Sequence, residues 1–286
     1  MIFIFNGRFC DSEQPQILVD NRSFRYGDGL FETMKARNGN LDIADLHFER
    51  LFTGLRLLQF SVPSFFSPAY IRDQVFALCR ENELTCLARI RLTVFRGEGA
   101  PFEEPSSPFH FIIQAWPLSP DVEQINAAGW TVDVFPDARK SCDLFSSLKS
   151  NNYLPYLMGA RYAKDRRLND ALVLNAFDRI AESTVANIFL YKRNAVYTPP
   201  LSEGCVAGVM RRFLLKMLRE NGWEVQETPI HPQELAAAEE IWLSNAIQGL
   251  RWVASCGSSA YGCEAGKRVH TMLFSRLKQE AGEDGF

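Results

Sequence analysis

Residues 180–189 read IAESTVANIF, and the architecture of the chain is easiest to infer from this stretch. It places one carboxylate, Glu182, at the mouth of an apolar strand. Earlier in the chain, residues 148–154 read LKSNNYL, which sets a single lysine, Lys149, beside small polar residues and an aromatic residue, just before a helical run. The two segments together supply an isolated amine and an isolated acid.

A glycine-rich helix start completes this set of groups. Gly204 and Gly208 precede the helical sequence that begins at Val209 and Met210. A lysine can form a Schiff base, a carboxylate can pair with a ring nitrogen, and a helix N-terminus can bind a phosphate group. These are the three parts that pyridoxal phosphate requires, so the sequence predicts a site for that cofactor.

The chain resembles the fold-type IV pyridoxal-phosphate enzymes, the family of branched-chain and D-amino-acid aminotransferases and aminodeoxychorismate lyase. The resemblance covers nearly the whole chain, because six short segments occur in the family's order. They are RYGDGLFE at 25–32, HFERL at 47–51, LKSNNYL at 148–154, AESTVANIF at 181–189, GVMR at 208–211 and LSNA at 243–246.

The resemblance implies a role for each group at the cofactor. Lys149 would form the aldimine and then move the substrate α-proton, and Glu182 would keep the ring nitrogen protonated. Tyr153 would hydrogen-bond the phenolic oxygen. Arg50 would bind the phosphate, with His47 as its structural neighbour on one helix face. The rest of the phosphate site would come from Val209, Met210, Ser244, Asn245 and Ala246.

The reaction depends on the groups that bind the substrate, because the family shares its cofactor apparatus. Residues 91–99 carry neither the branched-chain stretch nor the Arg-x-His pair of D-amino-acid aminotransferases. Arg25 and Arg179 are therefore the candidates for the substrate carboxylate. We expect a transaminase acting on an amino acid, with D-amino acids favoured over L, and on a 2-oxo acid such as 2-oxoglutarate.

Two alternatives stay open. Aminodeoxychorismate lyase is the first, because residues 25–33 and 243–249 resemble its motifs, although the loop after Arg96 lacks the second arginine of that pattern. A non-catalytic or hydrolytic protein is the second. Protein that never takes up pyridoxal phosphate would support that second alternative.

Strands and helices mix without regular alternation, which predicts an α+β fold with mixed sheets and packed helices. The resemblance implies the two-domain fold of D-amino-acid aminotransferases. Residues 1–116 would form a small domain, residues 117–122 an interdomain linker, and residues 123–286 a larger cofactor-binding domain. It also implies a homodimer, in which the loop at 25–29 reaches into the active site of the partner subunit.

Composition excludes several other partners. The 286 residues include 31 Lys and Arg against 34 Asp and Glu, which gives no basic surface for nucleic acid or an anionic membrane. No apolar stretch approaches the roughly 20 residues that span a bilayer, and no signal peptide is apparent. The 7 cysteines form no Cys-x-x-Cys pair and the 4 histidines do not cluster, so we expect a cytoplasmic protein without a metal site.

Overall fold

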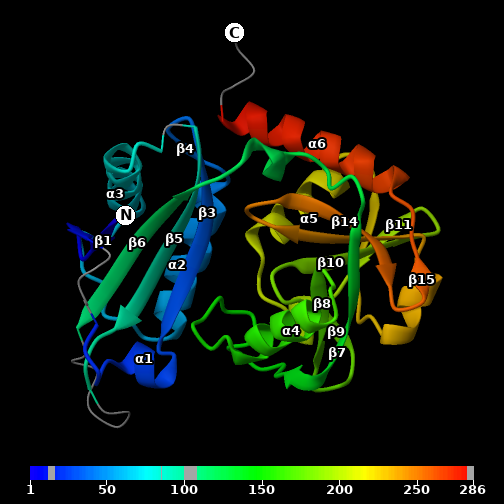
Figure 1. The fold of residues 1–286 in the computed structure, drawn as a ribbon, viewed down its shortest axis with the longest axis horizontal. Helices are drawn as coiled ribbons and strands as arrows, with labels where there is room; N and C mark the ends of the chain where they lie inside the picture. The colour runs from blue at the N-terminus through cyan, green and yellow to red at the C-terminus, as the bar shows by residue number, and fades with distance from the viewer. Residues whose placement is uncertain (12–16, 85, 100–107, 282–286) are drawn as a thin grey trace. The chain divides into compact units, whose positions relative to one another are not determined.

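A computed structural model describes residues 1–11, 17–84, 86–99 and 108–281 (Figure 1). The chain divides into two compact units. The first comprises Met1–Pro120 together with Lys149–Asn152, and the second comprises Asp121–Leu148 together with Tyr153–Phe286. The boundary at Pro120 falls inside the predicted linker, whereas the short segment that carries Lys149 belongs to the first unit.

The first unit is built on a six-stranded sheet in the order β2-β1-β6-β5-β3-β4. Every neighbouring pair of these strands is antiparallel. The strands are β1 (Ile2–Phe5), β2 (Arg8–Asp11), β3 (Gly29–Arg37), β4 (Asn40–Leu41), β5 (Leu87–Arg96) and β6 (Phe109–Pro117).

Helices α2 (Ala44–Leu57) and α3 (Pro68–Glu81) pack on this sheet (Figure 1). The alternation of β5 explains which face they cover, since Ile90, Leu92 and Val94 are fully buried. Arg91 and Thr93, which lie between them on β5, are only partly buried and lie on the opposite face. One face of the sheet is therefore a hydrophobic core, and the other carries polar side chains.

Arg25 lies in a short helix, α1 (Arg22–Tyr26), and not in the loop that the sequence suggested. The side chain of Asn21 accepts a hydrogen bond from the Phe24 amide and so caps the start of α1. Gly27 ends the helix with a φ of 70°, which favours glycine. The predicted loop at 25–29 is therefore the last turn of α1 followed by the entry into β3.

The second unit contains a nine-stranded mixed sheet in the order β12-β11-β10-β13-β14-β7-β8-β9, with β15 paired to β14. β7 runs parallel to both β14 and β8, whereas β10 and β13 are antiparallel. The strands are β7 (Trp130–Lys140), β8 (Asp170–Asn175), β9 (Ile180–Ser183), β10 (Asn187–Lys192), β11 (Ala195–Thr198), β12 (Glu224–Glu227), β13 (Glu240–Asn245), β14 (Gly249–Cys256) and β15 (Ser259–Ala260).

Three longer helices belong to the second unit: α4 (Leu154–Asp165), α5 (Val209–Glu220) and α6 (Glu264–Ala281). The mixed sheet and these helices confirm the predicted α+β class. Short 3-10 helices lie at η1 (Pro120–Glu123), η2 (Leu201–Glu203) and η3 (Pro232–Ala237). Within the described ranges, no helix combines the length and apolar character needed to cross a membrane.

Candidate active site

Lys149 is held against β3 in the first unit. Its carbonyl oxygen accepts a hydrogen bond of 2.9 Å from the Phe31 amide, and the amide of Asn151 donates to the Gly29 carbonyl at 3.0 Å. The Nζ atom of Lys149 lies 4.4 Å from the centroid of the Phe31 ring. Backbone pairing with β3 therefore fixes the main chain of the predicted Schiff-base lysine, and the Phe31 ring contacts its amine.

A buried cluster of Glu32, His47 and Arg50 joins β3 to α2 in the same unit. Arg50 Nε donates to Glu32 Oε1 at 2.8 Å, and His47 Nδ1 lies 2.6 Å from Glu32 Oε2. Burial alone would raise the pKa of Glu32, but the charges of Arg50 and His47 and their hydrogen bonds lower it to about 2. Burial lowers the pKa of His47. The phosphate-binding role of Arg50 stays a prediction.

Glu182 is the centre of a polar network in the second unit, where it is 3% exposed at the end of β9. Its Oε1 accepts hydrogen bonds from Lys140 Nζ at 2.5 Å, from the Tyr156 hydroxyl at 2.7 Å and from the Val206 amide at 3.0 Å. Its Oε2 accepts one, from Asn187 Nδ2 at 3.4 Å. The three hydrogen bonds to Oε1 thus fix the orientation of the carboxylate.

Tyr156 and Tyr153 lie side by side at the start of α4, with ring centroids 4.7 Å apart. Burial, and after it the negative charge of Glu182, raises the pKa of Tyr156, so its hydroxyl remains protonated and donates. The Tyr153 hydroxyl donates to the carbonyl of Thr184 at 3.2 Å. A hydroxyl can also accept, so Tyr153 keeps the capacity to bind a phenolic oxygen, which stays a prediction.

The predicted phosphate site forms around the start of α5. Gly208 is the N-cap residue, and the first-turn amides of Val209 and Met210 have no partner within a helix. A Cβ at Gly208 would lie 1.9 Å from Asn187 Oδ1, so the close approach requires glycine. Asn187 in turn lies opposite Ser244 in the register of β10 and β13.

Ser244 supplies the best test of whether a phosphate fits here. Its hydroxyl is buried and has no hydrogen-bond partner among the described residues. The next residue, Asn245, turns the chain by accepting from the amides of Ile247 at 3.0 Å and Gln248 at 2.8 Å, which places Ala246 in the turn. An orphaned buried hydroxyl beside a helix N-terminus suits a bound phosphate group. The residues present therefore fit pyridoxal phosphate.

The two arginines expected at the substrate carboxylate are found in different surroundings. Arg179 donates from Nε and Nη2 to the carboxylate of Glu203, at 2.5 and 2.8 Å. Arg25 lies over the ring of its neighbour Tyr26, 5.0 Å from the centroid. Their role at a carboxylate stays a prediction, and a substrate at Arg179 would compete with Glu203.

Two functional candidates escaped the sequence analysis. Arg91 lies on the polar face of β5 with its guanidinium carbon 3.8 Å from the centroid of Phe31, the ring that also contacts Lys149. The alternation of β5 was the available signal, since it places Arg91 opposite the core face. Lys140, at the end of β7, is the second, and its contact with Glu182 had no local signal.

No group of three or more His, Cys, Asp or Glu side chains that could hold a metal ion occurs in the part of the chain that the structure describes.

Comparisons with known proteins show the family of the chain. The family model described as amino-transferase class IV matches residues 29–256. Aminodeoxychorismate lyase of Vibrio harveyi is 28% identical over 250 residues, covering 83% of this chain and 86% of that protein. D-alanine aminotransferase of Bacillus licheniformis is 26% identical over 295 residues, covering 99% of both. The fold matches branched-chain aminotransferase from Thermoproteus uzoniensis with a TM-score of 0.87 at 22% identity, covering 100% of this chain and 96% of that one.

Proposed function

Because the chain belongs to the class IV amino-transferase family, we propose that it is a transaminase that moves an amino group between an amino acid and a 2-oxo acid such as 2-oxoglutarate. Enzymes of this family use pyridoxal phosphate. We favour D-amino acids as donors. The alternative is the elimination of pyruvate from aminodeoxychorismate, which the relative from Vibrio harveyi supports.

The bound cofactor would supply one thing, a protonated ring that withdraws electrons from the substrate α-carbon. The chain supplies the rest. Nζ of Lys149 would remove the proton from the substrate α-carbon and later give it back. The contact with the Phe31 ring keeps this amine beside β3. Glu182 would keep the ring nitrogen of the bound cofactor protonated. The proposed phosphate ligands are Arg50, the α5 N-terminus and Ser244.

The observation that carries the choice of substrate is the position of Arg91. Amino acids and 2-oxo acids share a carboxylate, and a guanidinium binds carboxylates in a two-point geometry. Arg91 and Lys149 contact the same Phe31 ring, so a substrate whose α-carbon meets the amine brings its carboxylate toward the guanidinium. We therefore add Arg91 to Arg25 and Arg179 as a residue for the substrate carboxylate.

A panel of D- and L-amino acids tests the proposal. Purified protein loaded with pyridoxal phosphate and freed of excess should change its absorbance with a D-amino acid while releasing the matching 2-oxo acid. Added 2-oxoglutarate should then restore the first spectrum. Lys149→Ala should abolish both changes and Lys192→Ala, in a surface ion pair, should not. Pyruvate released from aminodeoxychorismate, with no response to any amino acid, would establish the lyase instead.

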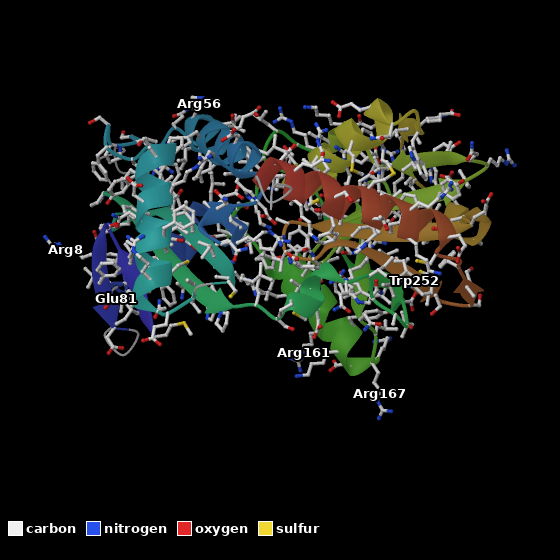
Figure 2. All side chains as sticks on the ribbon, turned by 90° about the horizontal axis from the view of Figure 1, so that it is seen from above. Arg8, Arg56, Glu81, Arg161, Arg167 and Trp252 are labelled. Atoms are coloured by element: carbon white, nitrogen blue, oxygen red, sulfur yellow. The ribbon has the colours of Figure 1, made fainter. Side chains whose placement is uncertain are left out.

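We further propose that the working unit is a homodimer in the cytoplasm. Helix α4 leaves Leu154, Leu157 and Met158 exposed, and Figure 2 shows Arg161 of the same helix pointing away from the ribbon. An apolar helix face of this kind suits a second copy of the chain, because exposed contiguous apolar surface marks interaction sites. The segment at 25–29 would then contribute to the partner's active site.

A further inference from the structure

Lys140 is a buried cation to which the proposed reaction gives no task. It ends β7, directly after an irregular stretch in which the pairing with β8 shifts register between Phe135 and Arg139. It is 9% exposed, its Nζ lies 2.5 Å from Glu182 Oε1, and the ring centroid of Tyr156 is 5.0 Å away. Its Nζ also donates to the Ser146 carbonyl at 3.4 Å.

The two oxygens of Glu182 are used very differently. Oε1 accepts from Lys140, Tyr156 and the Val206 amide, which exhausts the capacity of a carboxylate oxygen. Within the described part of the chain, Oε2 accepts only the long bond from Asn187. Oε2 is therefore the atom with room for a further N–H donor, and Lys140 acts from the opposite side of the carboxylate.

We propose that Lys140 is a positioning residue that keeps Glu182 ionised and so keeps the proton of the bound cofactor on its ring nitrogen. The inference rests on the proposed role of Glu182. A proton that moved from the ring nitrogen onto Glu182 would bring positive charge toward the ammonium group of Lys140. The Lys140 ammonium contacts the carboxylate and lies farther from any group bound beyond Oε2. It therefore stabilises the ionised carboxylate more than it repels a protonated ring, and it opposes transfer of the proton to Glu182.

The charge, and not the hydrogen bond alone, carries this effect. A neutral donor at position 140 would still orient Oε1, but the burial of Glu182 would then favour its protonated form. The proton would be shared with or transferred to Glu182, and the ring would lose electron-withdrawing power. A merely structural Lys140 would instead be replaceable by any residue that fills the space and donates a hydrogen bond.

Nitrogen-15 NMR of ring-labelled pyridoxal phosphate bound to the protein tests this directly, because the chemical shift of a pyridine nitrogen reports whether it carries a proton. In the wild type we expect the shift of a protonated ring. Lys140→Gln, which keeps a donor, and Lys140→Met should both move the shift toward that of a neutral pyridine. Lys140→Arg, which keeps the charge, should retain the wild-type shift.

Lys192→Met is the matched control, because Lys192 also forms an ion pair, 3.0 Å from Glu234, and also lies over a tyrosine, 4.7 Å from the Tyr197 centroid. It should leave the shift unchanged. A wild-type shift in Lys140→Gln would overturn the inference. If Lys140→Met does not fold, Lys140→Gln still decides the question.

Glu182→Gln separates this inference from the proposed function. The amide should give the neutral-ring shift by itself. A protonated ring in Glu182→Gln would overturn the proposed role of Glu182. A neutral ring in Glu182→Gln together with a protonated ring in Lys140→Gln would overturn the Lys140 inference alone.

Discussion

Arg50 binds Glu32 through two nitrogens, from Nε to Oε1 at 2.8 Å and from Nη2 to Oε2 at 2.5 Å. This two-point pair fixes the plane of the guanidinium group at the surface of α2. Arg50 therefore has two tasks, the neutralisation of a buried carboxylate and the predicted contact with the cofactor phosphate, and variants of Arg50 report on both.

Arg50→Ala should weaken the binding of pyridoxal phosphate to the cofactor-free protein. The loss of one charge-assisted contact costs about 1.5 to 3 kcal/mol, which corresponds to roughly a tenfold to hundredfold higher Kd. Arg56→Ala, on the same helix, is the control, since the Arg56 guanidinium donates to the Thr53 hydroxyl at 3.0 Å and not to Glu32. Titration of both proteins by absorbance measures the effect, and equal affinities would mean that Arg50 does not bind the phosphate.

The pKa of Glu32 predicts a specific loss of stability in acid. The pKa of Glu32 falls from 4.5 to about 2 on folding. Its contribution to the free energy of unfolding is therefore complete above pH 4.5 and is lost as the pH falls through about 2. The shift corresponds to about 3 kcal/mol. The free energy of unfolding, measured by denaturant titration across this range, should fall less steeply in Glu32→Gln. The exposed Glu224→Gln should follow the wild type, and an unchanged slope in Glu32→Gln would contradict the assignment.

Glu182→Gln should bind cofactor and substrate while the transfer of the α-proton slows. An amide does not hold the ring nitrogen protonated, so the step should fall on the order of a hundredfold, or about 2.7 kcal/mol. Single-turnover rates with a saturating amino donor measure this step. Glu234→Gln is the control. Near-equal rates would show that Glu182 has no part in the reaction.

Arg91→Ala should raise the KM for the amino donor more than it lowers kcat. The missing carboxylate contact is worth about 1.5 to 3 kcal/mol. Arg89→Ala provides a matched control, because Arg89 lies two residues away on the same face of β5, over Trp116 at 5.8 Å. Steady-state kinetics of both variants are compared at one pH. An equal rise in KM in both variants would mean that the positive charge of this face of β5, and not Arg91 itself, binds the carboxylate.

Leu157→Asp should turn the proposed dimer into a monomer without unfolding it. Leu157 is 59% exposed in the described chain, so a charge there meets water in the monomer but an apolar surface in the dimer. Leu144→Asp, at another exposed leucine of the second unit, is the control. Light scattering gives the mass of each protein. A wild type that is monomeric and fully active would contradict the dimer.

Local sequence predicted those parts of the candidate site that lie on one short segment. Glu182 and Gly208 were recognisable because an acid at a strand mouth and a glycine at a helix start are each signalled by their immediate neighbours. Lys140 was not, because its contact with Glu182 depends on the register shift between β7 and β8. A shift of this kind arises from pairing between segments that are distant in sequence.

The fold shows the same division between local and distant causes. Strand β3 gave no alternating signal, because it is buried along nearly its whole length. Helix α6 begins at Glu264, five residues before Val269, the first large apolar residue that it buries. Glu240, from β13, accepts hydrogen bonds from the amides of Ala265 and Gly266 and so caps this early turn. A cap supplied by another strand leaves no trace in the helix sequence.

Asn187 connects the two parts of the candidate cofactor site in the second unit, Glu182 and the start of α5. One amide side chain contacts Glu182 Oε2, binds the Val206 carbonyl at 2.9 Å and stands against Gly208 at the start of α5. The spacing between the acid and the helix start is therefore set by a single small group. A cofactor that contacts both Glu182 and the α5 N-terminus must match this spacing in length as well as in charge. A vitamer without the phosphate would therefore make only one of the two contacts, and one with a longer phosphate arm would be too long to make both.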